Sequence, residues 1–167
     1  PLDLEISQVG MTVDNTIKTR FIFEINKGSN KNPSIDVNSS MPHEDRRIPI
    51  DQMIYVADGP SDVPVFAVMK QMGGKAYAVY DPSSELEFEQ TCELVERGRV
   101  HNNGPADYTS KSPTSIWMKQ KVREILRRLV KKKMDKLNEK TGRPPTHINV
   151  DNTNLKTMDF KQEMFWQ

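Results

Sequence analysis

Two carboxylates, Asp58 and Asp62, follow directly on a short apolar run, and their types and spacing suit a hard cation. The apolar run covers residues 53–57 and has the length of a strand, while residues 59–61, Gly-Pro-Ser, supply turn chemistry. Carboxylate oxygens are the ligands that Mg2+ prefers, and Mg2+ keeps several of its waters. The same composition is also typical of a turn that caps a following helix, with Asp62 or the serine before it as the cap. The spacing therefore leaves two interpretations open, a Mg2+ site and a capped turn.

A strand, a turn and a helix must position these two carboxylates. The continuous apolar run 53–57 predicts a strand buried on both faces, as in a parallel sheet. A helix is predicted over residues 63–72 and a second strand over residues 75–80. A helix between two parallel strands is a right-handed crossover that brings both carboxyl ends to one edge of the sheet, where ligands bind. Asp81 is expected near Asp58 at that edge, with turn capping as its main role. The predicted fold class is α/β, with a parallel sheet flanked by helices.

Lys18 is the third residue whose placement suggests chemistry. Asp14 and its neighbours offer cap side chains for a helix over residues 17–26, which Gly28 ends. A cation in the first turn faces the positive end of the helix dipole and forgoes about 0.3–1 kcal/mol relative to an acid there. A phosphate at the helix N-terminus would reverse that sign, because backbone N–H groups and the ammonium would share one anion. The other interpretation of Lys18 is a solvated surface lysine.

The remaining segments carry charge rather than a second motif. A loop is expected over residues 28–50, in which His43 stands among mixed charges that lack metal-ligand spacing. An acidic amphipathic helix is expected over 83–96, a loop or short strand over 100–111, and a long basic amphipathic helix over 113–140. The basic helix suits an anionic partner such as nucleic acid, but no aromatic stacking platform accompanies it. This favours a solvated helix face paired with the acidic block, residues 81–107.

Composition limits the class of protein. The chain has 167 residues and a net charge of +1, and its 35% hydrophobic content is low for a fully globular domain of this size. A single cysteine, Cys92, excludes an internal disulfide and agrees with the reducing cytoplasm. No run is long enough to span a membrane and no signal peptide heads the sequence, so no membrane partner is expected. We expect one domain over residues 1–140, which begins with a strand at Leu4–Val9, and then an aperiodic segment, 141–167.

The run Ile54–Asp62 resembles the fourth, acidic motif of the haloacid dehalogenase-like hydrolases, an apolar strand followed by Gly-Asp-Gly-x-x-Asp, with Ala57 in place of the first glycine. Lys18 matches the third motif of that family, a lysine near the start of a helix that precedes the acidic motif, and Lys27, at the opposite end of the same helix, is the fallback candidate for it. The resemblance extends from about Val13 to Lys140. It implies part of a Rossmann-like sheet and a Mg2+-dependent phosphatase or phosphotransferase, which acts on a phosphorylated small molecule through an aspartyl-phosphate.

The resemblance also implies a role for each candidate residue. Lys18 would steady the nucleophile and the phosphate, Asp58 would ligate Mg2+, and Asp62 would hold either the waters of the metal or Lys18. These roles agree with phosphoryl transfer, which depends on neutralising charge and on in-line positioning.

The first motif of the family, Asp-x-Asp-x-Thr or Asp-x-Asp-x-Val after an apolar strand, has no match in the 167 residues. Asp3-Leu4-Glu5 comes too early to follow a strand, and Asp151-Asn152-Thr153 lies in the aperiodic segment. We therefore expect the C-terminal portion of a longer hydrolase, which lacks phosphatase activity alone and has the N-terminal half of the same fold as its partner. The alternative is a non-catalytic interaction module that presents the basic helix to an acidic partner or to nucleic acid.

Overall fold

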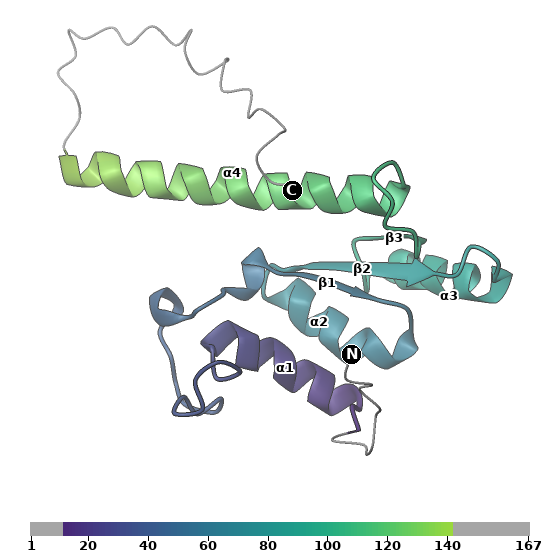
Figure 1. The fold of residues 1–167 in the computed structure, drawn as a ribbon, viewed down its shortest axis with the longest axis horizontal. Coiled ribbons are helices and arrows are strands. Elements are labelled where there is room, and N and C mark those ends of the chain that lie inside the picture. The colour runs from purple at the N-terminus through teal and green to yellow at the C-terminus, as the bar shows by residue number, and fades with distance from the viewer. Residues whose placement is uncertain (1–11, 142–167) are drawn as a thin grey trace, which may run out of the picture. The chain divides into compact units, whose positions relative to one another are not determined.

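The computed structural model describes residues 12–141 and contains a three-stranded parallel sheet (Figure 1). The strands, in their order across the sheet, are β1 (Ile54–Ala57), β2 (Lys75–Tyr80) and β3 (Asn102–Pro105). Helix α2 (Val63–Gln71) joins the first two strands and α3 (Glu85–Glu96) joins the second pair, since parallel neighbours need a crossover. The predicted α/β class, with a parallel sheet flanked by helices, is confirmed.

Helix α1 (Asn15–Lys27) forms where the cap signals predict a helix. The Asp14 Oδ1 atom accepts a hydrogen bond from the Ile17 N–H at 2.8 Å and so caps the first turn. Gly28 ends the helix with a φ of +88°, in the left-handed region that favours glycine. Lys18 therefore stands in the first turn of α1, as the sequence predicts.

Helices lie on both faces of the sheet (Figure 1). Helices α1, α2 and α3 contribute to the core on one face. The first part of α4 (Pro113–Thr141) covers the other face, where the ring of Trp117 packs on Tyr77 with centroids 4.6 Å apart. Thr114 Oγ1 donates to the Pro105 carbonyl at 2.5 Å and fastens the start of α4 to the end of β3. Coverage of both faces is what a parallel sheet requires.

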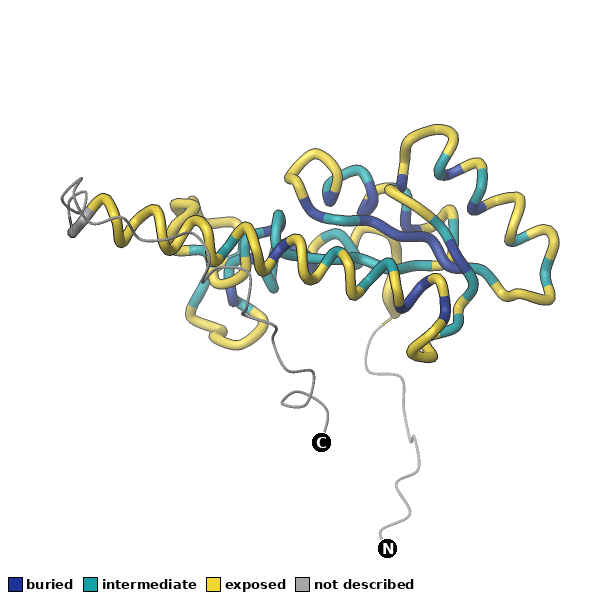
Figure 2. Tube along the Cα trace, turned by 90° about the horizontal axis from the view of Figure 1, so that it is seen from above, coloured by how far each residue is buried: buried dark blue, intermediate teal, exposed yellow. Residues whose placement is uncertain are grey.

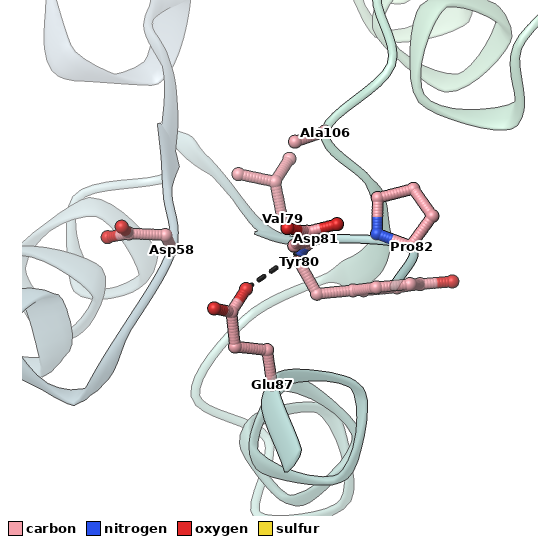
Figure 3. A pocket seen from close by; sticks show the side chains of 7 residues that line it. All are labelled: Asp58, Val79, Tyr80, Asp81, Pro82, Glu87 and Ala106. Atoms are coloured by element: carbon pink, nitrogen blue, oxygen red, sulfur yellow. Dashed lines mark hydrogen bonds between the residues drawn. The ribbon is translucent and has the colours of Figure 1, made fainter. Parts of the chain in front are cut away.

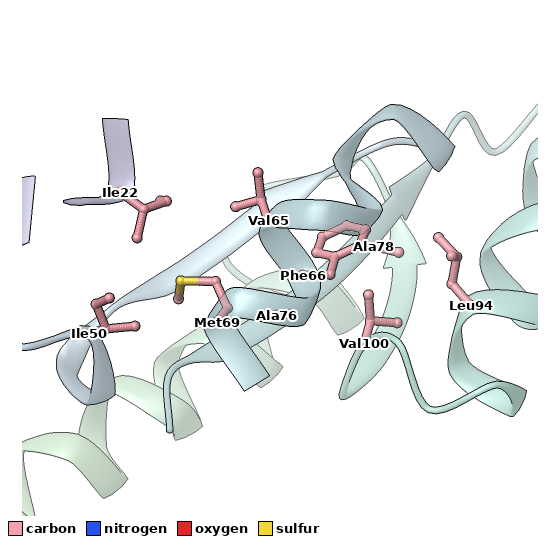
Figure 4. Packing of buried hydrophobic residues seen from close by; sticks show 9 residues of the cluster. All are labelled: Ile22, Ile50, Val65, Phe66, Met69, Ala76, Ala78, Leu94 and Val100. Carbon is pink, nitrogen blue, oxygen red and sulfur yellow. The ribbon is translucent and has the colours of Figure 1, made fainter. Parts of the chain in front are cut away.

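A buried apolar cluster between the sheet and α1–α3 fixes the position of α2 (Figure 4). Phe66 and Met69 of α2 are fully buried against Ala76 and Ala78 of β2, whose small side chains let the helix lie close to the strand. The cluster consists of Ile22, Ile50, Val65, Phe66, Met69, Ala76, Ala78, Leu94 and Val100. Because α2 is held in this way, the turn that precedes it is held as well.

The central strand β2 is buried along most of its length (Figure 2), whereas β1 is only half-buried at all four positions. The prediction that the 53–57 strand is buried on both faces is therefore wrong for the described part of the chain. The physical reason is the strand order, because β1 lies at an edge of the sheet and pairs with β2 alone among residues 12–141.

Most other predicted elements match the structure. Helix α3 and the long helix α4 form as expected, and the 28–50 segment is irregular apart from short 3-10 turns, η1 (His43–Asp45) and the start of η2 (Ile50–Gln52). Contacts divide the chain into one compact unit that ends at Leu126 and a second that begins at Arg127. The expected strand at Leu4–Val9 and residues 142–167 lie outside the described residues. Across residues 12–141, every helix is too short or too polar to traverse a bilayer.

Candidate functional site

Lys18 and Asp62 form an ion pair across 44 positions of sequence. The Lys18 Nζ atom lies 2.9 Å from Oδ1 and 3.0 Å from Oδ2 of Asp62, and it also donates to Ser61 Oγ at 3.1 Å. The side chain of Asp62 is 1% exposed, whereas that of Lys18 is 28% exposed. The structure therefore brings these two predicted site residues together, with the carboxylate buried and the lysine side chain still in contact with solvent.

The short 3-10 turn η3 (Pro60–Asp62) directs the carboxylate inward. The Asp62 N–H donates to the Gly59 carbonyl at 3.1 Å, which closes the turn between β1 and α2. Helix α1 packs against α2 and η3, so its first turn reaches the same place. Asp62 is the N-cap residue of α2, but its side chain makes no cap hydrogen bond. The interpretation of Asp62 as a helix-capping side chain is therefore wrong.

Tyr55, which the motif includes only as a member of its apolar strand, completes the network around Asp62. Its hydroxyl donates to Asp62 Oδ1 at 2.5 Å, and its ring meets Phe66 edge-on with centroids 5.8 Å apart. Burial is the largest cause that raises the pKa of the Tyr55 hydroxyl, followed by the hydrogen bond to Asp62 and the charges of Asp62 and Asp58. The hydroxyl therefore remains a donor at neutral pH. The sequence feature that could have identified Tyr55 is a tyrosine within an apolar strand, because a buried hydroxyl needs a polar partner.

Both carboxylate oxygens of Asp62 are occupied by protein donors. Oδ1 accepts from Tyr55 and contacts Lys18, while Oδ2 accepts from Lys18 at 3.0 Å and from Ser61 Oγ at 3.1 Å. A buried carboxylate with these contacts has no open face for a cation, and a metal ion there would stand against the Lys18 ammonium. Of the two roles that the family resemblance implies for Asp62, the geometry supports the holding of Lys18.

Asp58 has the opposite character, because it is exposed and lies directly after β1. It lines a hollow of about 330 Å³ at the carboxyl edge of the sheet, where ligands bind in α/β folds (Figure 3). The hollow is lined by Asp58, Val79, Tyr80, Asp81, Pro82, Glu87 and Ala106. Asp58 forms no ion pair with Lys18, so the two predicted acids lie in different surroundings.

Asp81 lines the same hollow as Asp58, as the crossover predicts, and its carboxylate caps the following turn. Asp81 Oδ1 accepts from the N–H of Ser83 at 2.9 Å and from its hydroxyl at 2.8 Å, and these bonds lower the pKa of the carboxyl. Glu87 Oε2 accepts from the Asp81 N–H at 2.8 Å, the dashed line in Figure 3. Two carboxylates of the hollow are thus tied to the turn, whereas the exposed Asp58 carboxylate points away from the other lining side chains (Figure 3).

Asp58 fits one ligand position of Mg2+, since this ion binds proteins through one or two carboxylates and otherwise through water and substrate phosphates. Asp62 does not fit as a second direct ligand, because its oxygens hold Lys18 and Tyr55. Within residues 12–141 no group of three or more His, Cys, Asp and Glu side chains is arranged to hold a metal. A Mg2+ ion bound by this part of the chain would therefore rest on Asp58 and on ligands from elsewhere.

Lys27, the fallback candidate for the lysine motif, binds the loop that follows α1. Its Nζ atom donates to the carbonyls of Val37 at 2.5 Å and Ser39 at 2.6 Å. Lys27 is thus held at the far end of α1 from Asp62. His43 is exposed and begins the short turn η1, which agrees with the expected solvated turn.

An uncharacterized protein of Borreliella burgdorferi is 34% identical to this chain over 120 residues. The match covers 70% of this chain and 39% of the relative, so the chain spans about two fifths of the length of that protein. No protein-family model and no solved structure matches the chain. These similarities therefore assign no function to the chain.

Replacing Tyr55 by phenylalanine removes the hydroxyl and keeps the ring on Phe66. We expect the free energy of unfolding to fall by about 1.5–3 kcal/mol, because the buried carboxylate of Asp62 loses a hydrogen bond. Folding raises the pKa of Tyr55 above its ordinary value of 10.0, so the unfolded chain loses this proton first and stability falls as the pH rises through that value. The variant should show a shallower alkaline decline. Urea unfolding at neutral pH and at about pH 9–11 measures both effects, and identical alkaline slopes would contradict the assignment.

Proposed function

We propose that this chain carries the lysine and acidic motifs of a Mg2+-dependent phosphatase or phosphotransferase of the haloacid dehalogenase-like type. The observation that supports this proposal is the buried Asp62 carboxylate that holds the Lys18 ammonium at 2.9 Å, while Asp58 stays open at the carboxyl edge of the sheet. A buried ion pair adds little net stability, since apolar residues of similar size in its place often stabilise a core equally well. A need to fix the position of Lys18 explains the pair better.

Phosphoryl transfer suits these side chains. Lys18, whose side chain reaches solvent, would bind and neutralise a phosphate oxygen, and Asp62 and Ser61 would fix its position. Asp58 would hold Mg2+, which when bound supplies further positive charge to the phosphate oxygens. The substrate would accordingly be a phosphorylated small molecule. The carboxylate that takes up the phosphoryl group as an aspartyl-phosphate belongs to the first motif, which has no match in these 167 residues.

The proposed partner is a further parallel strand beside β1, from the N-terminal half of the same fold. The sequence of β1 is Ile-Tyr-Val-Ala, which is typical of an interior strand, yet among the described residues it pairs with β2 alone. The opposite edge strand, β3, is Asn-Asn-Gly-Pro, which is typical of an exposed edge. A parallel strand added to β1 would end beside Asp58 and would bring the nucleophile there.

The location proposed with this function is the cytoplasm. The cysteine of the chain, Cys92, is a free thiol, which agrees with a reducing compartment. A membrane or a nucleic acid is no part of the proposed reaction.

A second candidate function is a non-catalytic interaction module that presents α4 to an acidic partner. Val130, Met134 and Leu137 are 61%, 53% and 47% exposed on a helix that also carries the Lys131–Lys133 cations. Exposed apolar residues in such number mark interaction surfaces, and the cations select an anionic partner such as an acidic protein or nucleic acid. Salt-dependent binding that charge reversal at Lys131–Lys133 abolishes would favour this function over the enzyme.

The proposal is tested by assaying Mg2+-dependent hydrolysis of an aryl phosphate with and without the missing motif. We expect no turnover by this chain alone, because it lacks the nucleophile, and turnover by a longer protein that joins this chain to an N-terminal half bearing Asp-x-Asp. Activity of the chain alone that is lost in Asp58→Ala would contradict the need for a partner. A longer protein that hydrolyses none of a panel of phosphate monoesters would contradict the phosphatase itself.

A further inference from the structure

A second hollow of about 330 Å³ lies away from the edge that carries Asp58. It is formed where α2 and α3 end, and both helices run from the carboxyl edge of the sheet back to its amino edge. Its lining residues are Ala67, Lys70, Gln71, Arg97, Gly98 and Arg99. Three of these six residues are cationic and none is acidic. The small residues, Ala67 and Gly98, leave the space between the cations open.

Backbone hydrogen bonds fix the turn that carries two of the three cations of this hollow. Gly98 has a φ of +64° and ends α3, and its N–H donates to the Val95 carbonyl at 2.8 Å while the Arg99 N–H donates to the Leu94 carbonyl at 2.7 Å. This turn places Arg97 and Arg99 on either side of the glycine. The Lys70 ammonium donates to the Gly98 carbonyl, which ties the end of α2 to the same turn.

The charge of the hollow is not balanced by neighbouring acids. Arg97 lies 3.2 Å from Glu93, but both side chains are more than 60% exposed, so this ion pair neutralises little. Arg99 forms no ion pair among the described residues. His101, the next titratable residue along the chain, has a pKa lowered first by burial and then by the charges of Lys75 and Lys70. Among the described residues, neither Arg99 nor Lys70 has an ion-pair partner that would neutralise its charge.

Helix termini explain only part of this cluster. A cation in the last turn of a helix is stabilised by the dipole, which accounts for Lys70 in α2, and Arg97 has its partner one turn back in α3. The last carbonyls of α3 already accept backbone N–H groups. Arg99 lies beyond α3 and forms neither kind of contact, so its guanidinium group remains available to an anion.

We propose that this hollow binds the phosphate group of a small anionic ligand, with Arg99 and Arg97 as its main contacts. Guanidinium groups present paired N–H donors that match two oxygens of one phosphate, and Lys70, held by Gly98, adds a point charge at a fixed place. The site is separate from the proposed phosphatase site and does not depend on it, because the two hollows share no residue.

Titration of the 15N-labelled chain with inorganic phosphate at constant ionic strength tests this site, with glycerol phosphate as a second arm that separates free phosphate from a phosphate monoester. We expect saturable shifts of the backbone amides of Gly98 and Arg99, with a dissociation constant in the range of about 0.1–5 mM. Arg99→Ala should weaken the binding about tenfold or more, and Arg99→Lys should restore part of it, since the charge returns without the paired donors.

Arg123→Ala, which removes an equal charge from an exposed position on α4, is the matched control and should bind phosphate as the parent chain does. The proposal is overturned if the shifts of the Gly98 and Arg99 amides do not saturate as phosphate is added. It is also overturned if Arg123→Ala weakens binding as much as Arg99→Ala, which would mark a nonspecific effect of net charge. Circular dichroism of each variant establishes that it is folded, and Arg99 is exposed, so its replacement should leave the fold intact.

Discussion

Asp62→Ala is expected to lower the free energy of unfolding by about 3 kcal/mol, the lower end of the range for breaking a buried ion pair. The variant loses the acceptor of the Tyr55 hydroxyl and the partner of Lys18 at once. A buried donor without an acceptor costs about 1–3 kcal/mol. The cost stays at the lower end because the side chain of Lys18 is 28% exposed and its ammonium can be hydrated.

The matched control is Asp58→Ala, the same chemical change at the other aspartate. Asp58 is exposed at the rim of a hollow, so we expect a change within about 0.5 kcal/mol. Asp62→Asn, which keeps an acceptor oxygen for Tyr55, should lie between the two. Urea denaturation at neutral pH measures all three variants. Equal stabilities of Asp62→Ala and Asp58→Ala would show that the network around Asp62 does not hold the turn in place.

The positions of Lys18 and Asp62 in their own elements could be predicted from the sequence because both residues stand at strong local signals, whereas their approach was implied only by the family resemblance. Asp14 and Gly28 bound α1 and fix Lys18 in its first turn. The apolar run that ends at Ala57 fixes where β1 stops and the turn begins. Caps and turns are determined by residues close in sequence, so their positions are visible without knowledge of the fold.

The role of Asp62 could not be predicted in the same way. Its spacing from Asp58 is the same whether it faces a metal ion, caps α2 or holds Lys18. The outcome depends on the Tyr55 hydroxyl at 2.5 Å and on burial of the carboxylate, and both arise from the packing of α1 and β1. These are tertiary features, which the order of residue types does not contain.

Strand β3 shows a second limit of sequence patterns. Asn102–Pro105 has no β-branched or aromatic residue, and its composition is compatible with a loop. It is a strand because β2 offers it a parallel partner. The pairing begins at the preceding residue, where the His101 N–H donates to the Ala76 carbonyl of β2 at 2.9 Å. Gly104 is needed there, since a Cβ atom would overlap the Tyr77 hydroxyl. Pairing with a strong central strand thus overrides a weak local preference.

Asp58→Asn is expected to lower Mg2+-dependent turnover by about 10²–10³-fold in a longer protein that joins this chain to the first motif. The amide keeps the size of the side chain but loses the negative charge that would hold the metal. Stability should change by no more than about 0.5 kcal/mol, because Asp58 is exposed. Steady-state kinetics at several Mg2+ concentrations, together with urea denaturation, separates the two effects.

Asp81→Asn is the control for this variant, since Asp81 lines the same hollow but its carboxylate caps the turn at Ser83. We expect it to keep turnover within about tenfold of the parent. Equal losses in both variants would point to the shape of the hollow rather than to a metal ligand. If the turn had no function, Asp58→Asn would leave turnover unchanged. In the proposed site the two aspartates differ: Asp62 affects stability through Lys18 and Tyr55, whereas Asp58 affects turnover and leaves stability unchanged.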